Sequence, residues 1–407
     1  MRSNYSQLGK YIREVDVRNS ELGDVKLLGV SIQKVLMPSI ANIIGTDMST
    51  YKLIKKNQLV YGPVTSRNSD RISVALLHEY EKAMVSQAYI TFEVIDKNEL
   101  LPEYLMMWFR RPEFDRYARF MSHGSAREIF SWEEMCNLEL PIPSISKQKD
   151  ILKEYNVLVG KINLGNQLIQ KLEETAQAIY KQWFVDFEFP DENGNPYKSH
   201  GGEMEFNMSL EREIPKGWVY NNFKAVAGRV FSGGTPDTNV EDYWNGEFSW
   251  FSSGETRNTV VIDSERTITK NGVKNSSTRQ SKVNDTLIAS AGQGKTRGQS
   301  SFCKIDTYIN QSIICIRPLK QFYSTWIFFN VHSRYAEIRN DSDVHSIRGS
   351  ITTKDIENLP LVIPTDPIIL NFETIGSAIV NKIYTNRKIL KELEKLKEIL
   401  HIRMSFI

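Results

Sequence analysis

The sequence is poor in the residues that build disulfide frameworks and metal sites. Its three cysteines, Cys136, Cys303 and Cys315, form no C-x-x-C pair, and its six histidines show neither H-x-x-x-H nor H-E-x-x-H spacing. A disulfide-stapled miniprotein and a cysteine or histidine zinc site are therefore not indicated. No run approaches the roughly 18 apolar residues of a membrane-spanning helix, and the N-terminus lacks the apolar core of a signal peptide. These absences predict a soluble, cytoplasmic chain.

An excess of charge of either sign is also missing. Lys and Arg number 51 against 49 Asp and Glu, a formal net charge of +2. A uniformly basic coat is excluded, so any surface for nucleic acid must be local. The length of 407 residues, with 41% hydrophobic residues, predicts two or three domains with sizeable cores.

A repeat with a constant offset of 221 residues connects the two halves of the chain. Residues 127–185 and 348–406 align without a gap and share 11 identities in 59 positions, including Arg127 with Arg348 and Pro143 with Pro364. Chance pairing would give roughly three or four identities. The sequence therefore predicts an internal duplication.

The second part of each repeat carries a seven-residue apolar pattern typical of a coiled-coil helix. Both copies interrupt the pattern at the same columns, Gly165 with Asn386 and Ala176 with Lys397, which favours two helices that pack on each other over two unrelated surface helices. The expected seam consists of Leu158, Ile162, Ile169, Leu172, Ile179, Ile379, Ile383, Leu390, Leu393 and Leu400.

The segments before the two helices mix strand-like and helix-like runs. The prediction is an α+β protein with an internal two-fold repeat, in which two mixed α/β domains are separated by two long helices that pair as an antiparallel coiled coil. Its parts are a globular domain (1–143), a helix (144–187), a Gly- and Pro-containing connector (188–217), a second globular domain (218–364) and a second helix (365–407).

Two motifs resemble catalytic sites but lack the context that such sites need. Residues 289–296, ASAGQGKT, match a relaxed phosphate loop, yet the next twenty residues have no helical period, and a phosphate loop needs a helix there. Asn195-Pro196-Tyr197 is similar to part of an amino-methyltransferase motif but follows no strand. We find no nucleophile–base arrangement, so the residues carry no catalytic signal.

Local charge is more informative than the total. Residues 265–304 hold eight basic residues against two acidic ones, and residues 105–127 hold five arginines against two acidic residues. Interspersed Ser, Thr, Asn and Gln add hydrogen-bond donors suited to phosphates and base edges. Ordinary solvated faces remain an alternative, but a basic segment in each of two duplicated domains favours duplex DNA binding.

The chain resembles the specificity subunits of type I restriction–modification enzymes. The resemblance is carried by LIQKLEETAQAIYKQWFVDFEFP (168–190), the connector phrase DENGNPYKSHGG (191–202), the entry EIPKGW (213–218) and SGGTPDTNVEDYWNGEFSWFSSGE (232–255). In this family the globular domains are target recognition domains. The resemblance implies a non-catalytic subunit that reads a bipartite, asymmetric duplex DNA target and holds the half-sites apart with its paired helices.

The same resemblance implies the partners and cofactors of the assembly. Two modification subunits carrying S-adenosylmethionine would dock on this chain and methylate adenines, and two restriction subunits could join them with ATP and Mg²⁺. None of these cofactors, and no metal, is expected on this chain itself.

By position, the resemblance places two loops of the second domain, and the equivalent turn of the first, against DNA. Arg127 and Arg348, just before the helices, either touch the DNA backbone or form structural ion pairs. The expected DNA-contacting residues are Thr65, Arg67, Asn68, Arg127, Thr235, Gln293, Lys295, Thr296, Arg297 and Arg348.

Two other functions stay open at this stage. The chain could be a coiled-coil scaffold whose globular domains bind protein partners. It could also be a nucleotide hydrolase built on the AGQGKT segment, which would require ATP to bind the isolated chain.

Overall fold

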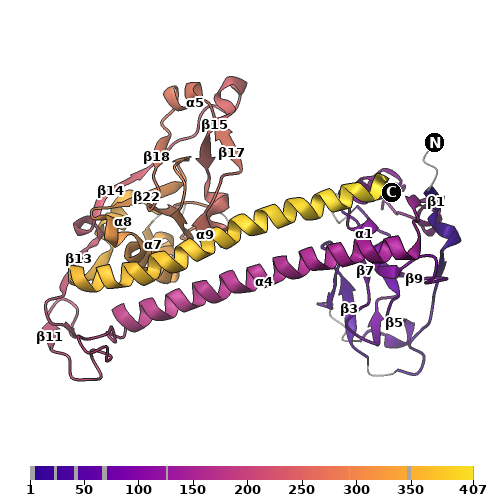
Figure 1. Ribbon diagram of the computed structural model, residues 1–407, viewed down its shortest axis with the longest axis horizontal. Helices are drawn as coiled ribbons and strands as arrows, with labels where there is room; N and C mark the ends of the chain where they lie inside the picture. Colours follow the sequence, from indigo (N-terminus) through magenta and orange to yellow (C-terminus); the bar gives the residue numbers. More distant parts are fainter. Residues whose placement is uncertain are drawn as a thin grey trace. The chain divides into compact units, whose positions relative to one another are not determined.

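The computed structural model describes residues 5–22, 25–40, 45–66, 71–124, 127–292, 294–345 and 350–406. The chain divides into two compact units (Figure 1). Unit 1 comprises residues 1–162 and 392–407, and unit 2 comprises residues 163–391. Each unit therefore contains one globular segment together with one part of each long helix.

The described part of unit 1 contains two four-stranded sheets and a two-stranded sheet. The first sheet has the order β2 (Ile12–Glu14), β9 (Ile90–Val94), β6 (Leu59–Tyr61), β7 (Val74–Leu76). The second has the order β4 (Leu36–Pro38), β3 (Leu27–Val30), β8 (Lys82–Val85), β5 (Lys52–Lys55), and β1 (Tyr5–Gln7) pairs with β10 (Glu139–Pro141). The short helices are α1 (Pro102–Phe109), α2 (Pro112–Phe120) and α3 (Trp132–Asn137), with 3-10 turns at Leu8–Lys10, Met48–Thr50 and Met404–Phe406.

Unit 2 has a five-stranded and a four-stranded sheet in its described residues. The five strands are ordered β14 (Ala227–Ser232), β22 (Ile313–Pro318), β19 (Thr286–Ala289), β20 (Ser300–Cys303), β16 (Val260–Val261), and the four are ordered β17 (Arg266–Ile268), β15 (Trp244–Phe251), β21 (Thr307–Ile309), β18 (Arg279–Ser281). β13 (Val219–Asn222) pairs with β23 (Pro360–Ile363), and β11 (Met204–Asn207) with β12 (Arg212–Pro215). The helices are α5 (Lys270–Lys274), α6 (Ser324–Ser333), α7 (Tyr335–His345) and α8 (Thr353–Asn358), with 3-10 turns at Phe223–Ala225, Glu241–Tyr243, Ser253–Arg257 and Gln321–Tyr323.

The strand orders show that the two globular segments are copies of one fold. The order β2-β9-β6-β7 corresponds to β14-β22-β19-β20, and β4-β3-β8-β5 corresponds to β17-β15-β21-β18. The parallel pair β3–β8 has its counterpart in the parallel pair β15–β21. Helices α3 and α8 differ by 221 residues at both ends, and each has a hydroxyl cap, Ser131 or Thr352. The predicted duplication and mixed fold are confirmed.

The two helix-like runs of the sequence, 102–121 and 322–340, each contain two helices, and a proline separates the two helices of the first run. Pro112 stands at the start of α2 and separates it from α1, because proline disfavours helix in the residue before it. The run at 322–340 likewise contains two helices, α6 and α7, with Arg334 as the C-cap of the first. The connector, whose composition indicated only turns, contains the hairpin β11–β12, which sequence reasoning did not predict.

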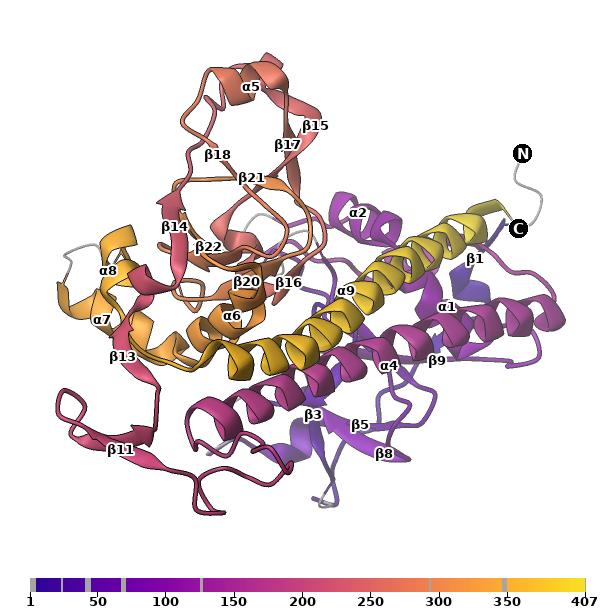
Figure 2. The same cartoon turned by 60° about the vertical axis from the view of Figure 1, so that its left-hand side comes forward.

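The two long helices are α4 (Ile145–Phe184) and α9 (Asp366–Arg403) (Figures 1 and 2). α4 begins shortly after Pro143. α9 has Pro367 in its first turn, where a missing N–H costs no hydrogen bond.

Within unit 2 the helices run antiparallel. An added Cβ at Gly165 would lie 2.6 Å from Cδ2 of Leu390. Further along α4, the ring of Trp183 lies 5.8 Å from that of Phe372, near the start of α9. In unit 1, Tyr155 stacks on His401 with ring centroids 5.4 Å apart, and Arg403 Nη1 lies 3.7 Å from Glu154 Oε2, so α4 residue numbers fall as α9 numbers rise. The helices thus pair antiparallel in each unit.

The predicted seam positions lie at or near the buried faces. Ile162, Ile169, Ile383 and Leu400 are at most 7% exposed. The remaining six positions are partly buried: Leu158, Leu172, Ile179, Ile379, Leu390 and Leu393. Gly165 leaves room for the Leu390 side chain, so this shared interruption of the pattern has a packing role.

Each globular core continues into the helix pair. In unit 1 Leu400 and Met404, from the end of the chain, join the cluster that contains Trp108 and Phe109. In unit 2 Phe184 of α4 and Phe372 of α9 pack in one cluster with Trp326 of α6. Burial of each such side chain contributes about 1.5–3 kcal/mol, so the helices are part of the domains and are not free linkers.

Candidate nucleic-acid interface

The glycine-rich segment of unit 2 is a hairpin loop. Residues 290–299 connect β19 to β20, which pair antiparallel. The Gly298 N–H donates to the Ala289 carbonyl at 2.9 Å, and Gly294 and Gly298 have φ values of +59° and +85°, which favour glycine. A strand, not a helix, follows Lys295-Thr296, so the loop lacks the helix N-terminus that a phosphate loop requires. The nucleotide-hydrolase hypothesis loses its structural basis.

The loop 232–238 follows β14 and is fixed by close backbone packing. An added Cβ would lie 1.9 Å from the Ile309 carbonyl oxygen at Gly233 and 2.0 Å from the Ser277 Oγ at Gly234, so neither position accepts a larger residue without rearrangement. Two tryptophan side chains donate hydrogen bonds to the backbone of this loop. Trp250 Nε1 donates to the Gly234 carbonyl at 3.2 Å, and Trp244 Nε1 donates to the Asp237 carbonyl at 3.0 Å.

A third segment, residues 310–312 between β21 and β22, joins these two loops. Thr235 Oγ1 donates to Oε1 of Gln311, and the Ser290 N–H donates to the Ser312 carbonyl at 2.9 Å. The three loops therefore lie together at one end of the domain. Gln311 is exposed there beside Thr235. Sequence reasoning missed Gln311, because a single glutamine after a strand belongs to no motif.

Helix α7 forms a hydrogen bond with the backbone of the hairpin loop. Tyr335 Oη donates to the Lys295 carbonyl at 2.8 Å, and Arg339 Nη1 donates to Tyr335 Oη at 3.2 Å. Lys295 is exposed, while Thr296 and Arg297 are partly buried. The backbone at Lys295 is thus fixed by a hydrogen bond from α7, while the Lys295 side chain is exposed. Gln293 and Arg348 lie outside the described residues.

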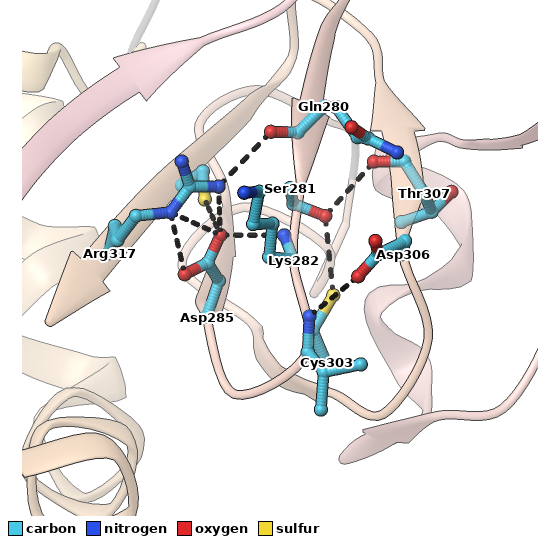
Figure 3. Close-up of polar contacts among 10 residues, drawn as sticks. Gln280, Ser281, Lys282, Asp285, Cys303, Asp306, Thr307 and Arg317 are labelled. Carbon is cyan, nitrogen blue, oxygen red and sulfur yellow. Dashed lines mark hydrogen bonds and ion pairs between the residues drawn. The ribbon is translucent and has the colours of Figure 1, made fainter. Parts of the chain in front are cut away.

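A partly buried ion pair fixes the strands that carry the hairpin (Figure 3). Asp285, 2% exposed, accepts from Arg317 Nη2 at 2.7 Å and from the Lys282 N–H at 2.8 Å. Nearby, burial raises the pKa of Cys303 to about 12 and raises that of Cys315 as well. Both thiols stay protonated at neutral pH, so they pack in this core as neutral side chains and are not activated nucleophiles.

The equivalent hairpin loop of unit 1 connects β6 to β7. Arg67 and Asn68 lie outside the described residues. Thr65 is 2% exposed, and its Oγ1 donates to Ser122 Oγ at 2.9 Å. Its hydroxyl therefore holds the loop internally, and the DNA contact expected of Thr65 stays a prediction. Arg127 is exposed beside this region.

Beside this loop, unit 1 has a cationic groove of about 870 Å³. Arg71, Arg110, Arg116 and Arg119 line it. Sequence reasoning found the basic run of α2 but not its convergence with Arg71 from the hairpin loop, which depends on the fold.

The described residues show no group of three or more His, Cys, Asp or Glu side chains able to hold a metal ion. In the same part of the chain, no helix combines the length and apolar character that crossing a membrane requires.

The family model of the type I restriction modification DNA specificity domain matches residues 37–174 and 215–401. The chain belongs to this family. A relative is the MjaIX specificity subunit of Methanocaldococcus jannaschii, 23% identical over 77% of this chain and 70% of that protein. Another is the HindI specificity subunit of Haemophilus influenzae, 27% identical over 50% of this chain and 40% of that protein.

A solved structure supports the fold. The crystal structure of the type I restriction-modification system S subunit from M. genitalium is similar over 98% of this chain and 95% of that one, with a TM-score of 0.60 and 13% identity. By its family, this specificity subunit is the DNA-recognition component of a restriction–modification system, not its enzyme. The protein-scaffold hypothesis gives way to this assignment.

Proposed function

We propose that the two globular domains of this specificity subunit each read one half of a bipartite, asymmetric duplex DNA target. The observation that carries the proposal is the duplication of one scaffold with different side chains on its equivalent hairpin loops. Residues 62–73 read GPVTSRNSDRIS, whereas residues 290–299 read SAGQGKTRGQ. Equal scaffolds with unequal polar groups favour two different base sequences.

In unit 2 the contacts would come from the clustered loops. Lys295, Thr296 and Arg297 supply cationic and hydroxyl donors from an ordered hairpin, and Thr235 with Gln311 offers a neutral polar pair beside them. Gln293 and Arg348, which lie outside the described residues, remain expected DNA contacts from the sequence alone. A glutamine amide can bond to adenine and a cation to guanine or phosphate, so this set can both position and discriminate.

In unit 1 the interface would combine Arg67, Asn68 and Arg127 with the arginines of the groove. Phosphate contacts of these cations would supply affinity and salt dependence, while neutral polar groups would supply sequence preference.

The paired helices would serve as the frame on which two modification subunits dock, and two restriction subunits would join that assembly. The antiparallel repeat gives two related surfaces, which supports two copies of the same partner. S-adenosylmethionine, ATP and Mg²⁺ would bind those partners.

Selection from a random duplex library, with the full chain and its partner subunits, tests the proposal. We expect enrichment of two short words at one fixed spacing.

Lys295→Ala should weaken DNA binding. It lowers the salt slope by about one if Lys295 contacts phosphate, or relaxes one position of the target if it contacts a base. Lys224→Ala, also at an exposed lysine but outside the loop cluster, is the matched control. Unchanged affinity and preference in Lys295→Ala would remove this residue from the interface.

A further inference from the structure

The cationic groove of unit 1 lies where helix α2 meets the turn between β3 and β4. At this meeting point Lys34, 5% exposed, forms an ion pair with Asp115, with 2.8 Å between Nζ and Oδ1. Lys34 also donates to the Phe109 carbonyl. The buried Lys34 thus balances the charge of Asp115, so this carboxylate does not offset the charge of the groove arginines.

Among the described residues, the groove arginines on α2 make exposed ion pairs. Arg116 pairs with Glu113 at 3.2 Å, and Arg119 pairs with Glu128 at 2.7 Å, with both cations at least 40% exposed. Such pairs contribute about 0–1 kcal/mol and exchange readily for another anion. The groove therefore offers its cations to a polyanion at little cost.

An apolar ring stands at the edge of this charged groove. Phe120, the last residue of α2, lines the groove and is 81% exposed. The buried face of the helix is made by Phe114 and Ala118, at 3% and 0% exposure. Phe120 therefore adds nothing to the core of its own domain. Contact with water is unfavourable for its apolar ring, and a ligand that covers the ring would gain this free energy.

The combination of ring and cations favours nucleic acid over a protein partner. Arginine and phenylalanine also occur at protein interfaces, but those interfaces rarely gather several cations of one sign. Here four arginines line one groove, and a polyanion that covers them brings stacked bases within reach of the adjacent aromatic side chain. Proteins that bend DNA insert Phe side chains between base steps next to such phosphate contacts.

We propose that Phe120 is a wedge that stacks against a partly opened base step of the first half-site while Arg116 and Arg119 hold the flanking phosphates. This inference rests on the proposed function, since it assigns a binding mode to the DNA contacts of unit 1. The wedge would make recognition depend on how easily that step unstacks, in addition to hydrogen bonding.

The test uses the full chain with its partner subunits and duplexes carrying the selected target, with 2-aminopurine at successive positions of each half-site. The wild-type complex should raise the emission at one step of one half-site. Phe120→Ala should abolish that rise and weaken binding roughly tenfold or more. Phe120→Trp should keep both, and Phe206→Ala, at a 60% exposed phenylalanine of the connector hairpin, should change neither.

The outcomes separate the wedge from the proposed function. If the wild type selects its target but Phe120→Ala matches it in affinity and emission, the wedge is wrong and DNA recognition stands. If Phe120→Ala instead loses a partner subunit in sedimentation, the ring serves a protein interface and the wedge is again wrong. A wild type without sequence preference would overturn both.

Discussion

At the scale of single residues, His401 shows how burial in the helix pair controls a protonation state. It is 8% exposed and stacks on Tyr155. Its Nε2 has no hydrogen-bond partner among the described residues. A charged imidazole here would lose its hydration without compensation, so the neutral form is favoured.

Burial is the main cause that lowers the pKa of His401 to about 4, and Lys397, Arg111 and Arg110 add to it while Glu113 opposes. Between pH 6.5 and 4 the unfolded chain binds a proton that the folded chain excludes, so stability is lost as the pH falls through this window. From pH 7 to pH 5, unit 1 should lose about 2 kcal/mol through this residue. Hydrogen exchange of unit 1 measures the loss, and His401→Phe, which keeps the stacking, should reduce it.

Glu373 provides an internal contrast in unit 2. Burial is the main cause that raises its pKa to about 6, despite hydrogen bonds from Thr325. For this carboxyl the folded state binds more protons between pH 6 and 4.5, so its contribution to stability grows as the pH falls. An equal pH response of both units, or no effect of His401→Phe, would contradict the assignment to His401.

At the scale of elements, a group of polar contacts fixes the second recognition domain to the helix pair. Arg387 of α9 donates to Asn258 Oδ1 at 2.7 Å and lies 3.4 Å from Glu173 of α4. Thr259 also donates to Glu173. Arg387 is 19% exposed at its side chain, so the contact combines three elements in a partly dry setting.

Arg387→Ala should loosen this attachment because it leaves Glu173 half-buried without its cation. We expect a loss of about 2 kcal/mol in the unfolding free energy of unit 2. We also expect a wider spread of spacings among selected targets, with the two words unchanged. Urea unfolding and library selection measure the two effects. Lys382→Ala, at an exposed position of the same helix, is the control, and an unchanged spacing distribution would show that the contact acts on stability alone.

At the scale of the whole molecule, the helices α4 and α9 each pass from one compact unit to the other. The contact pattern changes between Ile162 and Asn163 in α4 and between Lys391 and Glu392 in α9. A seven-residue insertion at both points preserves the phase of the apolar pattern, because seven residues make close to two turns.

Such a paired insertion adds about 10 Å of helix and should lengthen the spacer between the half-sites by about three base pairs. Selection from the random library gives the new spacing directly. Insertion of three residues in each helix, which takes the seam out of phase, is the matched disruption and should lower stability. An unchanged spacer in the paired heptad variant would mean that the helices do not set the separation.

The sequence alone determined the features that depend on periodicity and local chemistry. The 221-residue offset, the apolar seam with Ile162 and Ile383, and the proline-marked helix starts follow from patterns that local geometry imposes. The missing helix after Lys295 was likewise readable, because a helix needs a period that these residues lack.

Only the tertiary structure decided which separate segments share a surface. Thr65 sits in a sequence position suited to DNA contact, yet packing places its hydroxyl against Ser122. Gln311 and the arginine groove become candidate DNA contacts only because the fold brings them next to residues more than thirty positions away in the sequence. Burial and long-range hydrogen bonds arise from three-dimensional packing, and no local pattern in the sequence encodes them.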